Sequence, residues 1–259
     1  MGKLIPLLIF GLLLGKDDPV LSSIRSDALK MGIPEEYLNK TFSHSGITVH
    51  DKILERFAKP YEKKSWPEYR KLFVKESRIN EGSVFYKKHQ KTLEDISNNI
   101  KVDAVLILSI VGVESNFGRH KGKFTVFNSL YTQIAKMPGR SKWAQKELIA
   151  YLAFCYKDNI PPHSIKGSYA GAFGYGQFIP SSFNTYAIDG NSDGVRQPYI
   201  WADVFASVGN YLVKNGYPVS NPSNNARVYK AVYAYNHADN YVKAVLELRD
   251  ELKKRIITN

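Results

Sequence analysis

Residues 102–118 read VDAVLILSIVGVESNFG, and residues 102–114 form the most apolar run after the N-terminus. An uninterrupted apolar run of this length is typical of a buried helix rather than of a helix on the surface. Gly118 follows the run and is the expected terminator, because glycine readily closes a helix. We therefore expect a helical fold with this segment in its core.

Helical spacing recurs along the chain, whereas strand signals are weak throughout and we find no internal repeat. Residues 19–60 indicate short helices joined by loops, and Pro180 opens a short helix that we expect to be capped by the serines after it. Longer helices are expected over residues 80–98, 143–156, 203–215 and 226–256, the last broken near residues 236–239. The predicted fold class is mainly α, with a small, mostly helical N-terminal portion.

The composition suits one large domain, or one domain with a small appendage. The chain has 259 residues, 44% of them apolar, and a formal charge of +12. That charge attracts polyanions such as nucleic acid, anionic lipid or bacterial wall. The basic residues are spread out and no nucleic-acid motif accompanies them, so we expect no nucleic-acid partner. The single cysteine, Cys155, cannot form an internal disulfide and is expected to be buried.

The N-terminus carries the pattern of an export signal. Lys3 precedes an apolar run over residues 4–14, and polar residues 15–18 follow. The run is too short for an ordinary membrane span. Residues 1–18 are therefore expected to be an export signal, or an uncleaved anchor because the cleavage pattern is poor. No cysteine follows the run, which excludes a lipoprotein anchor, and peripheral or anchored membrane association remains open.

Glu114 is the candidate acid of the sequence. It ends the apolar run of residues 102–114, where desolvation is expected to raise the pKa of a carboxyl group. A carboxylic acid that keeps its proton near neutral pH can protonate a glycosidic oxygen. The alternative is a helix-end glutamate that faces water.

A glycine-rich stretch adds a candidate binding surface. Residues 168–180 read SYAGAFGYGQFIP, in which glycines alternate with aromatic residues before Gln177. Glycine lets a backbone approach a ligand closely. Aromatic rings and the amide of Gln177 can stack on and hydrogen-bond to sugar rings. The glycines could equally be a packing device.

The segment over residues 189–194, DGNSDG, begins like a calcium-binding loop. Asp189, Asn191 and Asp193 occupy the first, third and fifth places, with glycine at the sixth. The twelfth place is Ile200 instead of an acidic residue, which should weaken calcium binding. A polar turn without metal is the alternative, and no cofactor is required.

Several blocks together resemble the B-type lytic murein transglycosylases. They appear in the order of that family and cover roughly residues 60–245. The block over residues 166–183 is far more specific than the Glu-Ser block, which other lysozyme-like enzymes share. The blocks are residues 66–70, 112–118, 166–183, 203–211 and 235–237.

The resemblance implies a lysozyme-like catalytic domain over residues 19–259, with the substrate and calcium-type loops at about 166–200. It implies that Glu114 is the single catalytic acid/base and that Ser168, near its carboxyl group, and Gln177 line the site. It places Tyr69, Tyr211, Tyr235 and Asn236 around the cleaved bond. Arg140 would face the peptide stem, and Gly139 stands where relatives have a second arginine, so peptide contacts should be weaker.

The activity implied is cleavage of the bond between N-acetylmuramic acid and N-acetylglucosamine in peptidoglycan, with a 1,6-anhydro end as product. Most glycosidases divide this work between two carboxylates. A hydrolase that uses water on the same bond, and a wall-binding protein with little activity, are the alternatives. The expected location is the periplasm or cell envelope, and the oligomeric state is not predicted.

Overall fold

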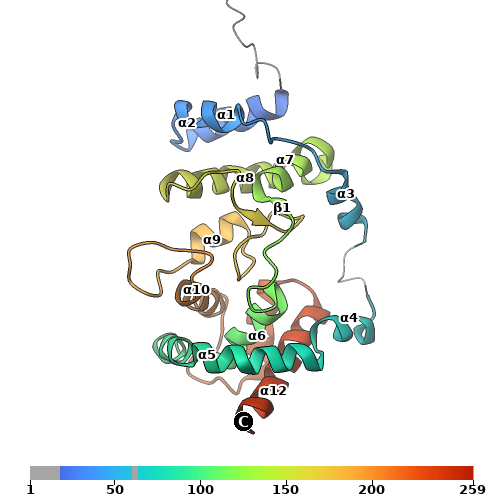
Figure 1. Ribbon diagram of the computed structural model, residues 1–259, viewed down its shortest axis with the longest axis vertical. Coiled ribbons are helices and arrows are strands. Elements are labelled where there is room, and N and C mark those ends of the chain that lie inside the picture. The colour runs from blue at the N-terminus through green and yellow to red at the C-terminus, as the bar shows by residue number, and fades with distance from the viewer. Residues whose placement is uncertain (1–17, 60–63, 259) are drawn as a thin grey trace, which may run out of the picture.

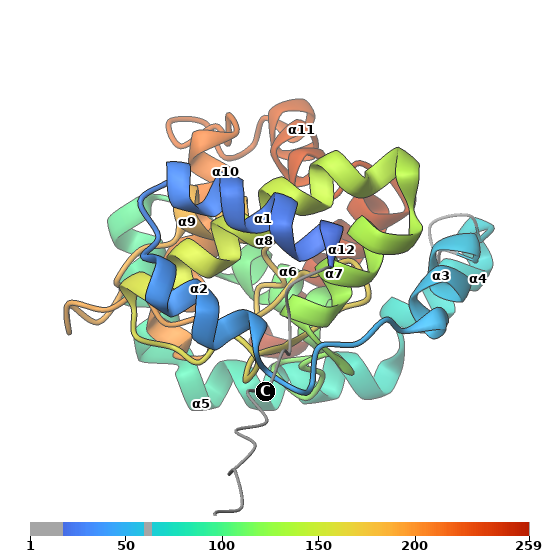
Figure 2. The same ribbon diagram turned by 90° about the horizontal axis from the view of Figure 1, so that it is seen from above.

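A computed structural model describes residues 18–59 and 64–258, and they are mostly helical (Figure 1). Helices α1 (Pro19–Lys30) and α2 (Glu35–Phe42) lie above α7 (Val126–Lys136) and α8 (Pro138–Lys157). Seen from above, α1 lies over α8, and α3 and α4 stand to one side (Figure 2). The prediction of a mainly α fold is confirmed.

The short helices expected over residues 19–60 are present. Asp18 caps α1 by accepting the Val20 N–H at 2.8 Å. Helix α3 (Asp51–Ala58) packs on α7, and α4 (Trp66–Phe73) packs on α12. Nearly all of the predicted export signal lies outside the described residues.

Helix α6 (Ala104–Ser115) is the core helix that the apolar run predicts. The Asp103 carboxylate caps it by accepting the Val105 N–H at 2.9 Å. Most of its side chains are buried against α5 (Glu76–Ile100), α10 (Trp201–Lys214) and α12 (Asp239–Ile257). This helix therefore forms the centre of the lower part of the molecule (Figure 1).

The prediction that Gly118 terminates this helix is wrong. The helix ends at Ser115, and Asn116 is the C-cap with φ 50°. Asparagine is among the few residues that adopt left-handed backbone at low cost, so it can close a helix as glycine does. Gly118, with φ 81°, continues the turn that Asn116 begins.

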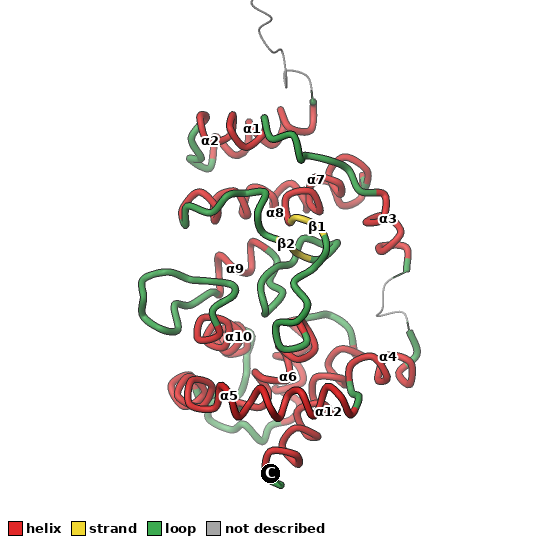
Figure 3. Tube along the Cα trace, in the orientation of Figure 1, coloured by secondary structure: helices red, strands yellow, loops and turns green. Residues whose placement is uncertain are grey.

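Loops and a two-stranded sheet fill the middle of the molecule (Figure 3). Strand β1 (Phe124–Thr125) pairs antiparallel with β2 (Lys166–Gly167), with Phe124 opposite Gly167. Two-residue strands agree with the weak strand signals. The loops between the upper and lower helices include the glycine-rich stretch, which follows β2 directly.

The broken last helix is confirmed. Helix α11 (Asn225–Tyr235) ends at Tyr235, with Asn236 as its C-cap, and α12 begins at Asp239. The two helices pack on each other, and the break turns the chain between them. Tyr235 and Asn236 therefore lie at a corner and not on a continuous helical surface.

None of the helices in the described residues is by itself long and apolar enough to cross a membrane. The stretch Trp66–Ile100 together with α6, bent by 116°, has the length and composition of a broken span. Most of α6 is buried inside the protein, as core helices are.

The expected serine cap on α9 (Pro180–Tyr186) is wrong. Ile179 is the N-cap residue and supplies no side-chain bond. Instead, Glu147 of α8, which is only 4% exposed, accepts the Ser181 N–H at 2.9 Å and the Ser181 hydroxyl at 2.7 Å. A carboxylate from another helix thus accepts a hydrogen bond from an N–H group at the start of α9. Its negative charge also interacts favourably with the positive end of the helix dipole.

We expect Glu147→Ala to lower the free energy of unfolding by about 1–3 kcal/mol, because the half-buried N–H and hydroxyl donors of Ser181 lose their acceptor. Urea denaturation followed by circular dichroism measures the change. Glu55→Ala, on the exposed face of α3, is the matched control and should change stability little. Equal stabilities of the two variants would show that the Glu147 cap does not support the fold.

Candidate active site

Glu114 lies in the last turn of α6, half-buried at the rim of the core. The Tyr241 hydroxyl donates a hydrogen bond of 2.7 Å to its Oε1 atom. Tyr241 belongs to α12 and is 2% exposed, so its ring is a fixed part of the core. The carboxyl group is therefore held in place by a buried partner and is not free in open solvent.

The phenols near Glu114 remain protonated. Burial raises the pKa of Tyr235 and of Tyr241 well above the ordinary value, and the negative charge of Glu114 raises both further. Their rings lie nearly parallel, 8° apart, with centroids 6.5 Å apart. Tyr69 is buried close enough to Tyr241 to add to the rise in its pKa. Tyr235 and Tyr241 therefore stay neutral near the carboxyl group, and the Tyr241 hydroxyl donates to it.

A left-handed turn fixes the end of α6. Asn116, Phe117 and Gly118 all have positive φ. The Asn116 side chain accepts a bond from the buried Arg78 at 3.0 Å and donates to Glu81 at 3.1 Å. Left-handed backbone is costly outside glycine and persists where surrounding contacts hold it. These contacts therefore support the turn directly after Glu114.

The glycine-rich stretch is tied to α11 beside this cluster. The Tyr235 hydroxyl donates to the Gly176 carbonyl at 2.6 Å. Gln177 has φ 50°, and its side-chain amide donates to the Gly174 carbonyl at 2.8 Å. Gly174 has φ 76°, and a Cβ there would lie 2.8 Å from the Pro198 carbonyl oxygen, so only glycine fits.

A cleft of about 270 Å³ opens where the stretch meets α11. Three predicted site residues, Gln177, Tyr211 and Tyr235, share it. The ring of Tyr211 meets that of Tyr235 edge-on at 4.8 Å, and its hydroxyl donates to the Ala234 carbonyl at 2.7 Å. The lining comprises Gln177, Phe178, Ile179, Ser182, Tyr211, Ala234, Tyr235 and His237. Asn236, half-buried, lies between two of the lining residues in the chain.

Ser168 organises the start of the stretch. Its hydroxyl accepts the N–H groups of Ala170 at 3.2 Å and Ala172 at 3.1 Å. Ser129 of α7 donates to the Ser168 carbonyl at 2.9 Å. The expected contact of Ser168 with the carboxyl group of Glu114 stays a prediction.

Arg140 belongs to a different group of contacts. Its guanidinium lies over the rings of Phe57 at 4.7 Å and Trp143 at 4.4 Å. Its Nε donates to Gln133 at 3.1 Å, and Gln133 in turn donates to the Tyr169 carbonyl at 3.3 Å. Partial burial lowers the pKa of Arg140. Arg140 is therefore linked through Gln133 to the glycine-rich stretch. Its contact with a peptide stem stays a prediction.

In the calcium-type loop, side-chain carboxylates accept hydrogen bonds from N–H groups of the loop itself. Asp189 accepts the Asp193 N–H at 3.2 Å and the Gly194 N–H at 2.7 Å, and the Asn191 amide donates to Asp193 at 2.9 Å. Asp203, which is 1% exposed, closes the loop by accepting the N–H groups of Gly190 at 2.9 Å and Gln197 at 2.6 Å.

Oxygen donors of this kind suit calcium. In the parts of the chain that the structure describes, no three acidic, histidine or cysteine side chains converge on one point as a metal site. Asp203 lies beyond the twelfth place of the loop, so a count along the sequence misses it. The loop therefore offers oxygen atoms of the kind that calcium binds, already arranged by hydrogen bonds to the loop's own N–H groups.

Tyr241 is the contact of Glu114 that sequence reasoning missed. Tyr241, Val242, Val245 and Leu248 form the buried face of α12, so Tyr241 looks like an ordinary core residue. The two residues are far apart in the sequence, and only the folded structure shows that the Tyr241 hydroxyl lies next to the Glu114 carboxyl group. A buried tyrosine needs a partner for its hydroxyl, and this was the one available signal.

The sequence of this chain is similar to those of known proteins. Residues 16–226 match the family profile described as transglycosylase SLT domain. The chain is 34% identical over 153 residues to membrane-bound lytic murein transglycosylase B of Escherichia coli, covering 59% of this chain. It spans 42% of the length of that relative.

Solved structures share the fold. Lytic transglycosylase SltB1 of Pseudomonas aeruginosa is 26% identical, with a TM-score of 0.85 over 93% of this chain and 99% of the other. Lytic transglycosylase SLT35 of Escherichia coli in complex with calcium has a TM-score of 0.81 at 23% identity, over 93% and 95% of the two chains. The lysozyme-like fold and the family resemblance are confirmed, and the chain belongs to the transglycosylase SLT domain family.

Proposed function

We propose that this protein is a lytic transglycosylase that cleaves the bond between N-acetylmuramic acid and N-acetylglucosamine in peptidoglycan, with Glu114 as its single acid/base. The observation that carries the proposal is the hydrogen bond from Tyr241 to Glu114, made beside the stretch that Tyr235 anchors. An oriented carboxyl group next to a cleft lined by aromatic rings and an amide suits a sugar chain.

The first step is proton transfer from Glu114 to the glycosidic oxygen. The bond between this oxygen and the anomeric carbon of N-acetylmuramic acid then breaks, and N-acetylglucosamine leaves with the proton as a hydroxyl group. The carboxylate that forms accepts the Tyr241 hydroxyl at Oε1, and a hydrogen bond to the charged form favours that form. Positive charge then develops at the anomeric carbon, where the substrate's own N-acetyl oxygen can share it. Asn236, at the corner between α11 and α12, is a candidate donor to that N-acetyl group.

The second step returns the proton. Ionised Glu114 takes the proton of the 6-hydroxyl of the same sugar, and this oxygen attacks the anomeric carbon to close the 1,6-anhydro ring. The attack is intramolecular, so proximity favours it over attack by water. Tyr235 contributes by position, since its hydroxyl already donates to Gly176 and so fixes the stretch that lines the cleft.

A location in the periplasm or cell envelope follows from the substrate. We infer export through the N-terminal segment, either cleaved or retained as an anchor. The protein needs no cofactor for the steps above, since Glu114 supplies and removes the proton. Calcium in the loop of Asp189 would stabilise the fold rather than take part in them.

Digestion of purified murein tests the activity. We expect mass spectrometry to find glycan ends that have lost one water, the 1,6-anhydro form. Glu114→Gln should lower the rate at least about 100-fold, because a general acid typically contributes 10²–10⁴. The control is Glu55→Gln on the exposed face of α3, which should cleave normally. Reducing ends would indicate the hydrolase, and full activity of Glu114→Gln would remove Glu114 from its role.

Replacing Tyr241 by Phe tests the hydrogen bond. Activity should decline as pH rises and the protonated acid is depleted. The bond favours the ionised carboxylate, so its loss should move this decline to higher pH. The pH profile of murein cleavage measures the shift, with Tyr233→Phe on the exposed side of α11 as control. Identical profiles of Tyr241→Phe and wild type would contradict the role of Tyr241.

Thermal unfolding tests the calcium loop. Ile200 stands where a calcium loop has its bidentate carboxylate, which implies weak binding, so millimolar calcium should add about 1 kcal/mol and raise Tm by about 2–4 °C. Magnesium at the same concentration is the control and should do less, because it demands tighter octahedral geometry. Asp189→Asn should lose the calcium effect. A gain that persists in Asp189→Asn, or no gain in wild type, would exclude this loop as the site.

A further inference from the structure

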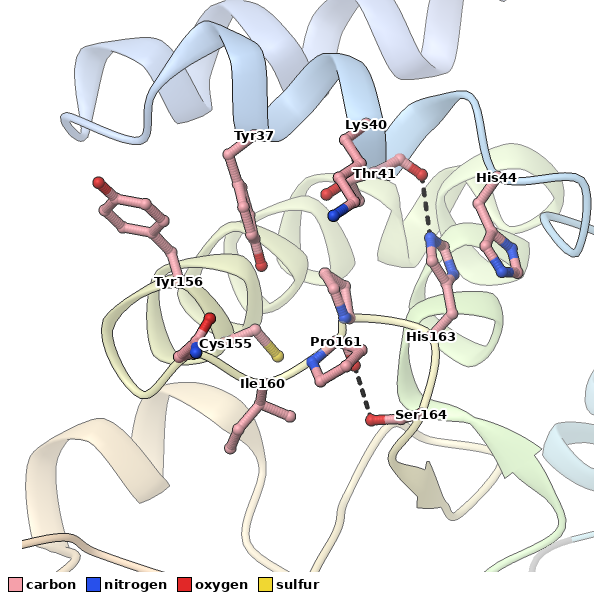
Figure 4. Close-up of a pocket in the computed structure, with 12 residues that line it drawn as sticks. Tyr37, Lys40, Thr41, His44, Cys155, Tyr156, Ile160, Pro161, His163 and Ser164 are labelled. Atoms are coloured by element: carbon pink, nitrogen blue, oxygen red, sulfur yellow. Dashed lines mark hydrogen bonds between the residues drawn. The ribbon is translucent and has the colours of Figure 1, made fainter.

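A second and larger cavity, of about 530 Å³, lies between α2 and the loop that follows α8 (Figure 4). It shares no lining residue with the cleft of Gln177 and Tyr235. Its volume is in the range of sites that hold small organic molecules. The lining comprises Tyr37, Lys40, Thr41, His44, Cys155, Tyr156, Asn159, Ile160, Pro161, Pro162, His163 and Ser164.

One side of the cavity is apolar and rigid. The rings of Tyr37 and Tyr156 meet edge-on with centroids 5.2 Å apart. Ile160 and Pro161 continue this wall along the loop, and Cys155 lies at its base (Figure 4). Such a surface suits a flat apolar body, since aromatic and proline side chains lose little freedom on binding.

Lys40 supplies a positive charge to the same cavity. Its side chain extends from α2 into the space between Tyr37 and His163 (Figure 4). No acidic residue is among those that line the cavity. Within residues 18–59 and 64–258, no carboxylate forms an ion pair with Lys40. The cavity therefore has a cation that its own walls do not neutralise.

Tyr37 supplies a donor that the protein does not use. Its hydroxyl is buried, and in the described residues it has no partner in hydrogen-bond geometry, although Thr41 is near. Burial, with Cys155 close by, raises the pKa of Tyr37 far above its ordinary value, so the group stays a protonated donor. A buried polar group without a partner destabilises the protein, and an oxygen atom of a ligand would recover that loss.

The histidines close the polar end. The rings of His44 and His163 stack 4.1 Å apart at 13°. His163 lies 2.9 Å from the Thr41 carbonyl through Nε2, which must carry the hydrogen because a carbonyl only accepts. Burial, with the neighbouring His44, lowers the pKa of His163, so this ring is neutral at pH 7 and adds no positive charge to that of Lys40.

We propose that this cavity is a binding site for a small organic carboxylate with a flat apolar body. Its carboxylate would pair with Lys40, the Tyr37 hydroxyl would donate to it, and its body would pack on Tyr156, Ile160 and Pro161. The site is independent of the glycan cleft, so its occupancy is measured without any cleavage assay.

The test is an amide NMR titration of the full chain with benzoate and with benzamide, its uncharged counterpart. We expect saturable shifts confined to residues 37–44 and 155–164, with benzoate binding about three- to fivefold more tightly than benzamide. That ratio matches the strength of an exposed ion pair, up to about 1 kcal/mol.

Two variants and one control assign the binding of the two ligands to this cavity. Lys40→Gln should remove the preference for benzoate and leave benzamide unchanged, whereas Lys52→Gln on α3, an exposed lysine, should leave both unchanged. Tyr156→Ala, at a residue 47% exposed, should weaken both ligands by removing the apolar wall. Equal binding of the two ligands to wild type, an unchanged preference in Lys40→Gln, shifts centred on the Gln177 cleft, or no saturable shift at all would each overturn the proposal.

Discussion

The hydrogen bond between Tyr241 and Glu114 joins the two helices on which the site depends. Helix α6 carries the carboxyl group and α12 carries the hydroxyl, and these helices pack against each other in the core. Because Tyr241 is fully packed, its hydroxyl cannot follow a moving carboxyl group. The position of Glu114 is therefore set by core packing and not by the surface on which substrate would lie.

The surrounding turns support that one contact. Asn116 ends α6 directly after the carboxyl group and is held by Arg78 and Glu81. A second turn is the break between α11 and α12. It allows Tyr235 to donate a hydrogen bond to Gly176, while Tyr241, six residues later, donates one to Glu114. One short corner of the chain thus positions both the acid and the glycine-rich stretch.

Much of this arrangement could be predicted from the sequence because its signals are local. The apolar run gives α6, and the interruption near residue 236 gives the corner between α11 and α12. Gln177, Tyr211 and Tyr235, three of the residues that the resemblance singles out, line one cleft. Their roles toward substrate remain proposals, since position in a cleft is not yet contact with a sugar.

What could not be predicted depends on pairs that are far apart in the chain. Glu147 caps α9 from α8, and Asp203 closes a loop that begins at residue 189. Tyr241 has the sequence pattern of a core residue, and only the folded structure shows that its hydroxyl also donates a hydrogen bond to Glu114. The cavity beneath α2 likewise combines residues 37–44 with 155–164, and neither segment has a motif of its own.

The most direct test of the account is a crystal structure of Glu114→Gln with a bound glycan oligosaccharide that spans the cleavage site. The account predicts a glycosidic oxygen within hydrogen-bond distance, about 3 Å, of the residue 114 amide, with one sugar ring against the stretch that holds Gln177. A sugar chain lying elsewhere, with its linkage oxygens out of reach of residue 114, would contradict it.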